Sequence, residues 1–215
     1  MDEVTAFLVG QQSATTAINA PYGVNRGLVK AMLQKEMLSP HKARTTDCRL
    51  AEYELRERGI AVKGTPSSVA ACPSGVKSGF SLYRKLLKMG FQKYPEDGAS
   101  HQFLETNSHA CYNVLAEGAP LPRLTLEGKI QRQLLLYELG LHIKDPMEFF
   151  EEITRYKMMR GVWPLDLLYQ PDQLDAMVAA YTAWLVVNKP TEVTFVGDEK
   201  EGKIALPERN LKGKY

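Results

Sequence analysis

Residues 170–187, with the sequence QPDQLDAMVAAYTAWLVV, form the stretch that decides the fold. Pro171 suits the first position of a helix, and Asp172 is a good N-cap residue for the exposed amides of the first turn. Four apolar residues recur at three- and four-residue spacing, namely Leu174, Val178, Tyr181 and Leu185. This spacing predicts one long helix with an apolar stripe that packs against a core.

Asp175 lies in the first turn of this helix, beside the apolar stripe. Acidic side chains are favoured in first turns because they interact well with the positive end of the helix dipole. A carboxylate in this place is also suited to a functional site at the mouth of a cavity. Both interpretations of Asp175 stay open.

Two strand-like runs precede this helix, and each ends in a polar residue. Residues 15–19 (TTAIN) are stopped by the loop residues 20–23 (APYG), and Phe103 and Leu104 are followed by Glu105. The carboxyl ends of parallel strands meet at one edge of a sheet, which would bring Asn19 and Glu105 together there. The alternatives are that Asn19 closes a turn before proline and that Glu105 is solvated.

The remaining segments predict an α/β protein. Helices are expected over residues 79–89, 108–115, 124–139 and 145–159, two strands of a hairpin over residues 191–197 and 203–206, and a long loop over residues 63–78. Lys129 and Arg132 are neighbours on one helix face, which suits either a basic contact surface or a solvated edge. We expect a single domain over residues 1–215 and a flexible basic tail over residues 207–215.

Composition excludes several classes of protein. Of 215 residues, 44% are apolar and 24% charged, and the net charge of +2 gives no general basic field. Three widely spaced cysteines, without a signal peptide or a membrane-spanning run, predict reduced thiols in a cytoplasmic protein without membrane association. The sequence has no Gly-rich phosphate loop and no metal-binding histidine spacing, so a small-molecule α/β enzyme has no motif in its favour.

Several segments together resemble an uncharacterised family of predicted nucleases with an RNase H-like fold. Residues 17–21 (AINAP) are similar to that family's IDAP strand end, and residues 105–112 (ETNSHACY) to its E-x-x-P-H-A segment. Residues 125–133 (TLEGKIQRQ) resemble its TLEGR-x-QRQ helix, and the match continues through residues 145–155, 174–184 and 197–207. The resemblance covers nearly the whole chain from about residue 15.

The resemblance implies metal-dependent phosphodiester hydrolysis, a nuclease activity. In an RNase H fold, carboxylates from separate strands and a late helix gather one or two divalent ions, Mg²⁺ or Mn²⁺. By resemblance, Asp175 and Glu105 are the metal ligands, and Asn19 stands where the family has a catalytic aspartate. Lys129, Arg132 and Arg49 are the expected phosphate contacts of a nucleic-acid substrate.

Two departures favour an alternative function. By resemblance, Asn19 replaces an acid, and the chain is expected to lack the first three strands of an RNase H fold, including the first-strand aspartate. The alternative is a non-catalytic RNase H-like module that binds nucleic acid or a protein partner. The strand at residues 15–19 would also have an unpaired edge, through which a homo-oligomer could form.

Overall fold

The computed structural model describes residues 2–35, 46–153 and 155–215, and in these ranges the strands form one five-stranded sheet. The sheet runs in the order β1–β3–β5–β4, and the short β2 pairs with β3 beyond the end of β5. All neighbours are parallel except β4 and β5, which form a C-terminal antiparallel hairpin. The strands are β1 (Ala14–Ile18), β2 (Gln92–Lys93), β3 (His101–Thr106), β4 (Thr194–Asp198) and β5 (Gly202–Leu206).

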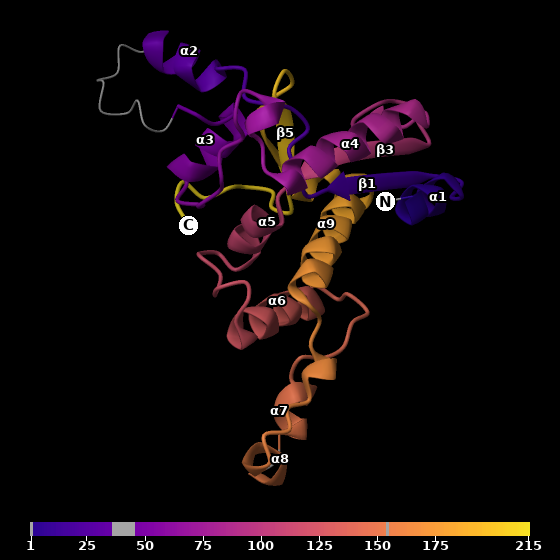
Figure 1. The fold of residues 1–215 in the computed structure, drawn as a ribbon, viewed down its shortest axis with the longest axis vertical. Coiled ribbons are helices and arrows are strands. Elements are labelled where there is room, and N and C mark those ends of the chain that lie inside the picture. Colours follow the sequence, from indigo (N-terminus) through magenta and orange to yellow (C-terminus); the bar gives the residue numbers. More distant parts are fainter. Residues whose placement is uncertain (1, 36–45, 154) are drawn as a thin grey trace.

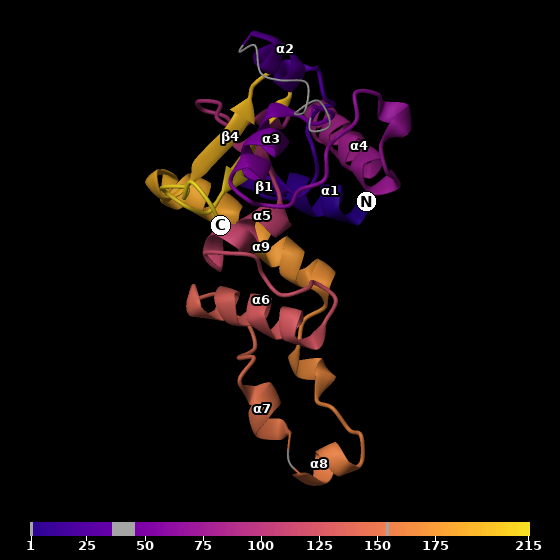
Figure 2. The ribbon, with the colours of Figure 1, turned by 90° about the vertical axis from the view of Figure 1, so that its left-hand side faces the viewer.

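Helices lie on both faces of the sheet, which confirms the α/β class predicted from the sequence. They are α1 (Asp2–Val9), α2 (Leu28–Lys35), α3 (Leu50–Glu57), α4 (Ser74–Lys88), α5 (Ser108–Leu115), α6 (Leu126–Glu138), α7 (Glu148–Glu152), α8 (Arg155–Met159) and α9 (Pro171–Asn188). Figure 1 shows α9 running from the sheet towards α6, and Figure 2 shows α7 and α8 as an arm at the far end. No helix of the described ranges combines the length and apolar character needed to cross a membrane.

Helix α9 forms where the sequence predicts it, with a different residue at its start. Gln170 is the N-cap, its amide donates to Gln173 Oε1 over 2.8 Å, and Pro171 takes the first helical position. Leu174 and Val178 are completely buried, as the apolar stripe predicts, whereas Tyr181 is only half-buried. The buried face is wider than the stripe because Ala179, Thr182, Ala183 and Val186 also pack against other elements.

The main core lies between α9, α3, α5 and the hairpin. Its buried members include Leu55, Tyr112, Leu136, Leu174 and Ile204. A second cluster fills the space between β1, β3 and α4, where Ile18, Tyr83 and Phe103 pack together. Because α9 and α4 cover opposite faces of β1, the end of this strand is held between two packed layers.

Glu201, in the turn of the β4–β5 hairpin, fixes the starts of two helices from the other end of the chain. It is fully buried, and its carboxylate accepts hydrogen bonds from the amides of Arg26 (2.6 Å), Leu28 (3.4 Å) and Leu50 (2.8 Å). These amides precede or begin α2 and α3, which leaves them without partners inside the helices. Glu201 therefore supplies a cap to both helices at once.

Three segments differ from the sequence-based expectation. Helix α4 begins at Ser74, with Pro73 as its N-cap residue. The long loop predicted over residues 63–78 is therefore shorter than expected. The helix predicted over residues 145–159 is two short helices, with Ile153 in an extended conformation after α7 and residue 154 outside the described ranges. Phe149 of α7 is buried and stacks on Trp163, a tertiary contact that local periodicity does not reveal.

The tail of residues 207–215 lies against the body of the protein. The Tyr215 amide donates to Arg58 O over 2.8 Å, and the side chains of Leu211 and Tyr215 pack partly buried on the main core. These contacts restrain the tail, and its flexibility stays a prediction.

Candidate functional site

Glu105, near the end of β3, is held by an arginine from another part of the chain. Arg49 precedes α3, and its Nη1 and Nη2 atoms donate to Oε2 (2.9 Å) and Oε1 (2.5 Å) of Glu105. The amide of Tyr22 donates a third hydrogen bond, over 2.8 Å, to Oε2. Both carboxylate oxygens are thus engaged by protein donors, and this two-point geometry is the strong form of an ion pair.

Arg49 is itself enclosed and almost saturated. Its side chain is 1% exposed, its Nε donates to Glu52 Oε1 over 2.9 Å, and its Nη1 also donates to Glu201 O over 3.0 Å. Glu52 is buried too, and it accepts from the amide of Thr65 over 2.7 Å and from the Thr65 hydroxyl. The result is a buried network that links α3, β3 and the hairpin.

The electrostatics of this network follow from its burial. The two carboxylates raise the pKa of Arg49 far above its ordinary value, although desolvation acts the other way, so the guanidinium stays charged. Burial raises the pKa of Glu105, while Arg49 and the Tyr22 amide act in the opposite direction. The charge of Glu105 therefore depends on Arg49 remaining in place.

Asn19 is the residue directly after β1, and it caps a helix. Its Nδ2 donates to Ser108 Oγ over 2.8 Å, and its Oδ1 accepts from the Ser108 amide over 3.0 Å. Asn107 adds a second cap, because its Oδ1 accepts from the Ala110 amide over 2.9 Å. Asn19 therefore ties the end of β1 to the first turn of α5.

Asp175 lies in the first turn of α9 and pairs with an arginine that the sequence analysis did not single out. Arg123 donates from Nε (2.9 Å) and approaches from Nη2 (2.8 Å) at the same atom, Oδ2, and it also contacts Asp172. The Asp175 side chain is 15% exposed, which is less than a freely solvated first-turn carboxylate would show.

His109 on α5 is a titratable neighbour of Asp175. Burial lowers the pKa of His109 below its ordinary value, Arg132 lowers it further, and Asp175 raises it. His109 follows Ser108, which Asn19 binds at the end of β1. Because Asp175 interacts with His109, it also lies near the carboxyl end of β1.

The three candidate residues share cavities in pairs. Asn19 and Glu105 line a cavity of about 380 Å³, and Asn19 and Asp175 line a groove of about 1100 Å³. In the described part of the chain, no three His, Cys, Asp or Glu side chains group closely enough to hold a metal ion. The metal-ligand role of Glu105 and Asp175 stays a prediction.

The expected phosphate contacts are mostly enclosed. Arg132 is buried, donates to Leu121 O (2.8 Å) and Gly128 O (2.9 Å), and lies 5.2 Å from the centre of the Tyr112 ring. Arg49 belongs to the buried network. Lys129 is half-buried on α6, and among the described residues its ammonium group has no hydrogen-bond or ion-pair partner, unlike the guanidinium groups of Arg49 and Arg132.

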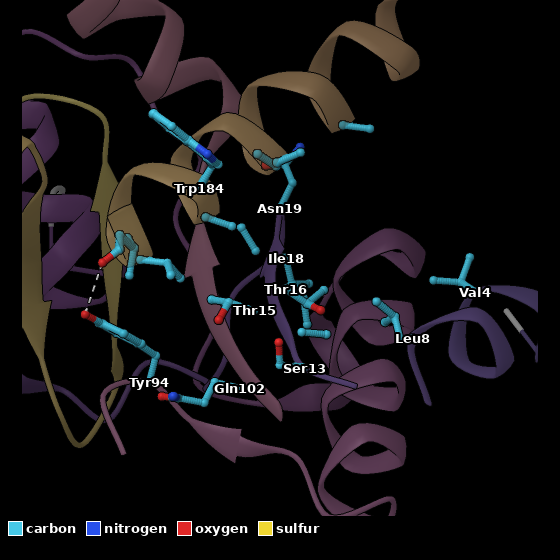
Figure 3. Close-up of a pocket in the computed structure, with 18 of the residues that line it drawn as sticks. Val4, Leu8, Ser13, Thr15, Thr16, Ile18, Asn19, Tyr94, Gln102 and Trp184 are labelled. Atoms are coloured by element: carbon cyan, nitrogen blue, oxygen red, sulfur yellow. Dashed lines mark hydrogen bonds between the residues drawn. The ribbon is translucent and has the colours of Figure 1, made fainter. Parts of the chain in front are cut away.

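The groove that holds Asp175 runs along the open edge of β1 (Figure 3). Its walls come from α1, α4 and α9, with Leu8, Ala180 and Trp184 among the lining residues. In Figure 3, Thr15 and Thr16 lie on opposite sides of the strand, Thr15 towards Tyr94 and Thr16 towards Leu8. Among the described residues, Thr16 Oγ1 is the buried side-chain polar atom left without a hydrogen-bond partner.

Comparison with known proteins identifies a family and no activity. A family model described as "Protein of unknown function (DUF429)" matches residues 1–201. The searches of curated proteins and of solved structures found no match for this chain.

Proposed function

Because the chain belongs to this family of unknown function, we propose a function from its own geometry: a non-catalytic RNase H-like module that acts by binding a partner. The observation that carries the proposal is that both candidate catalytic acids are engaged by arginines. Arg49 holds both oxygens of Glu105, and Arg123 holds Asp175. In this arrangement the two acids stabilise the fold, and we therefore assign the protein a binding function.

The donor set does not fit a divalent metal in this arrangement. Mg²⁺ takes carboxylate oxygens and waters in a near-octahedral shell, which requires oxygens that are free to approach the ion. Both oxygens of Glu105 accept hydrogen bonds, and Asn19 Oδ1 accepts from the Ser108 amide. Releasing Glu105 would leave the Nη1 and Nη2 atoms of the buried Arg49 guanidinium without the carboxylate that they bind, which is costly.

A protein partner is better supported than nucleic acid. Non-specific nucleic-acid binding depends on accessible lysine and arginine side chains that neutralise phosphates. Arg49 and Arg132, two of the three basic residues expected to contact phosphate, are buried. With a net charge of +2, the protein has no large basic field to compensate for their loss.

A cleavage assay tests the proposal directly. RNA, DNA and RNA–DNA hybrids are incubated with the purified protein and Mg²⁺ or Mn²⁺, alongside the Asp175→Asn variant. We expect no metal-dependent cleavage above the background that the variant shows. Metal-dependent cleavage that is lost in a folded Asp175→Asn variant would overturn the proposal and support the nuclease activity that the resemblance implies.

A further inference from the structure

The outer edge of β1 carries backbone groups without partners. The Ala14 amide donates to Ser100 O over 2.9 Å, so Ala14 and every second residue after it direct their backbone groups towards β3. Thr15 and Ala17 therefore direct their amides and carbonyls away from the sheet. In the described part of the chain, β1 has no strand on that side and neither residue has another backbone partner.

The space beside this edge has room for another strand. The groove of about 1100 Å³ follows β1 along its whole length, from Ala14 to Ile18. Helix α9 lines it with Ala176, Ala180 and Trp184, whose indole is 49% exposed. Figure 3 shows Leu8 and Val4 of α1 on the opposite side of the strand from Trp184. An apolar slot with an open strand at its floor is the geometry of strand addition.

The Thr16 hydroxyl is a second, independent indication that β1 lacks a binding partner. Its hydroxyl oxygen is buried on the Leu8 side of the strand and has no partner among the described residues. Buried polar atoms normally have a hydrogen-bond partner, because leaving one unpaired is costly. A hydroxyl-bearing residue on a neighbouring strand would supply that partner.

The charge of the groove favours a peptide strand over a nucleic acid as its occupant. Among the described residues, its charged lining residues are Asp172 and Asp175, at the carboxyl end of β1, and Arg123 offsets part of their charge from outside the lining. No lysine or arginine of the described ranges lines it, so this lining does not attract a phosphate backbone. The lining instead complements an apolar strand that carries a basic side chain at the end near Asp172.

We propose that the groove binds an extended segment of a partner protein, which pairs with the open edge of β1 as an added strand of the sheet. The inference rests on the proposed function as a binding module and names the partner's chemistry. The segment is apolar with interspersed hydroxyl residues and a basic end. Because β1 has five residues, the paired part spans about 17 Å.

Designed peptides test this proposal. Two acetylated and amidated probes, Lys-Val-Thr-Val-Thr-Val and Val-Thr-Val-Thr-Val-Lys, cover antiparallel and parallel docking. Methylation of every second amide leaves one free edge for pairing and prevents the peptides from stacking on each other. The matched control peptides are methylated at every amide and have no free edge. Binding is measured by titration calorimetry and by tryptophan emission in a Trp163→Phe background, in which Trp184 is the remaining tryptophan.

We expect one probe to bind and to shift the emission of Trp184 to the blue. Each backbone hydrogen bond that methylation removes in the control peptide should weaken binding by about fivefold. Ala180→Arg fills the groove from an exposed helix position and should weaken binding by about tenfold or more. Ser78→Arg, an equal charge change at an exposed position of α4 outside the lining, should leave it unchanged. Both variants should keep the wild-type melting temperature.

Three results would overturn the inference. They are the absence of binding by either probe, equal binding of the fully methylated peptides, and equal binding by Ala180→Arg. Self-association of the protein or binding of a single-stranded oligonucleotide that Ala180→Arg abolishes would assign the groove to a different occupant. The cleavage assay is separate, so a failure of the proposed function is recognised independently of peptide binding.

Discussion

The buried network around Arg49 leads to the sharpest prediction, for the Arg49→Met variant. The Arg49 side chain makes four hydrogen bonds, two to Glu105, one to Glu52 and one to Glu201 O. Methionine fills much of the same space and removes the charge, leaving two buried carboxylates without their shared cation. Breaking a buried ion pair in this way costs about 3–5 kcal/mol, a large share of the roughly 5–15 kcal/mol by which domains are stable.

The assay is urea unfolding followed by far-UV circular dichroism. Arg84→Met, which alters an exposed arginine of α4, is the matched control and should change the free energy of unfolding by less than about 0.5 kcal/mol. The double variant Arg49→Met/Glu105→Leu should regain part of the loss, with a coupling energy of about 1–3 kcal/mol, because it removes one unpaired carboxylate. A cost below about 1 kcal/mol for Arg49→Met would refute the structural role of the network.

Three further predictions concern single residues. His109→Gln should make the free energy of unfolding depend less on pH on the acid side. The pKa of His109 is lowered in the folded state, so the neutral imidazole contributes stability above the unfolded pKa of about 6.5. In the wild type, this contribution is lost as the pH falls below that value. Thermal melts between neutral and acidic pH check this, and an equally steep decline in the variant would contradict it. Gly128→Ala should cost about 1–3 kcal/mol, because a Cβ atom there would lie 1.9 Å from Pro122 O, and chemical unfolding measures the loss against Gly118→Ala, where nothing lies within 4 Å. Deletion of Tyr215 should lower stability by about 1 kcal/mol and increase proteolysis of the tail, whereas an unchanged protein would indicate that the tail is flexible.

Local patterns predicted much of the fold. Capping and periodicity give α9 and α6, with Thr125 accepting from the Gly128 amide as a capping residue does. Short strand-like runs that end in polar or turn residues give β1, β3 and the hairpin. These elements depend on neighbours within a few residues, and such information is present in any single sequence.

The partners of the candidate acids could not be predicted in this way. Arg49 and Glu105 are 56 residues apart, and Arg123 and Asp175 are 52 residues apart. Nothing in spacing or composition pairs them, because the pairs exist only once the sheet and helices have packed. The sequence predicts Glu105 as a metal ligand and Arg49 as a phosphate contact, and it does not predict that the two bind each other. Asn19 lies at a strand end as predicted, but its hydrogen bonds to Ser108 in the first turn of α5 were not predicted, because the alternative considered for it was a turn before proline.

The position of Glu201 has a consequence for how the protein forms during synthesis. Residues 26, 28 and 50 leave the ribosome long before residue 201, so their amides have only water as a partner until the hairpin emerges. The same hairpin pairs with Glu105 and Thr106 at the end of β3, so this part of the strand also lacks its partner until the hairpin emerges. Nascent chains that end before residue 201 should therefore expose α2 and α3 to chaperones, and protection should arrive in one late step when the hairpin docks.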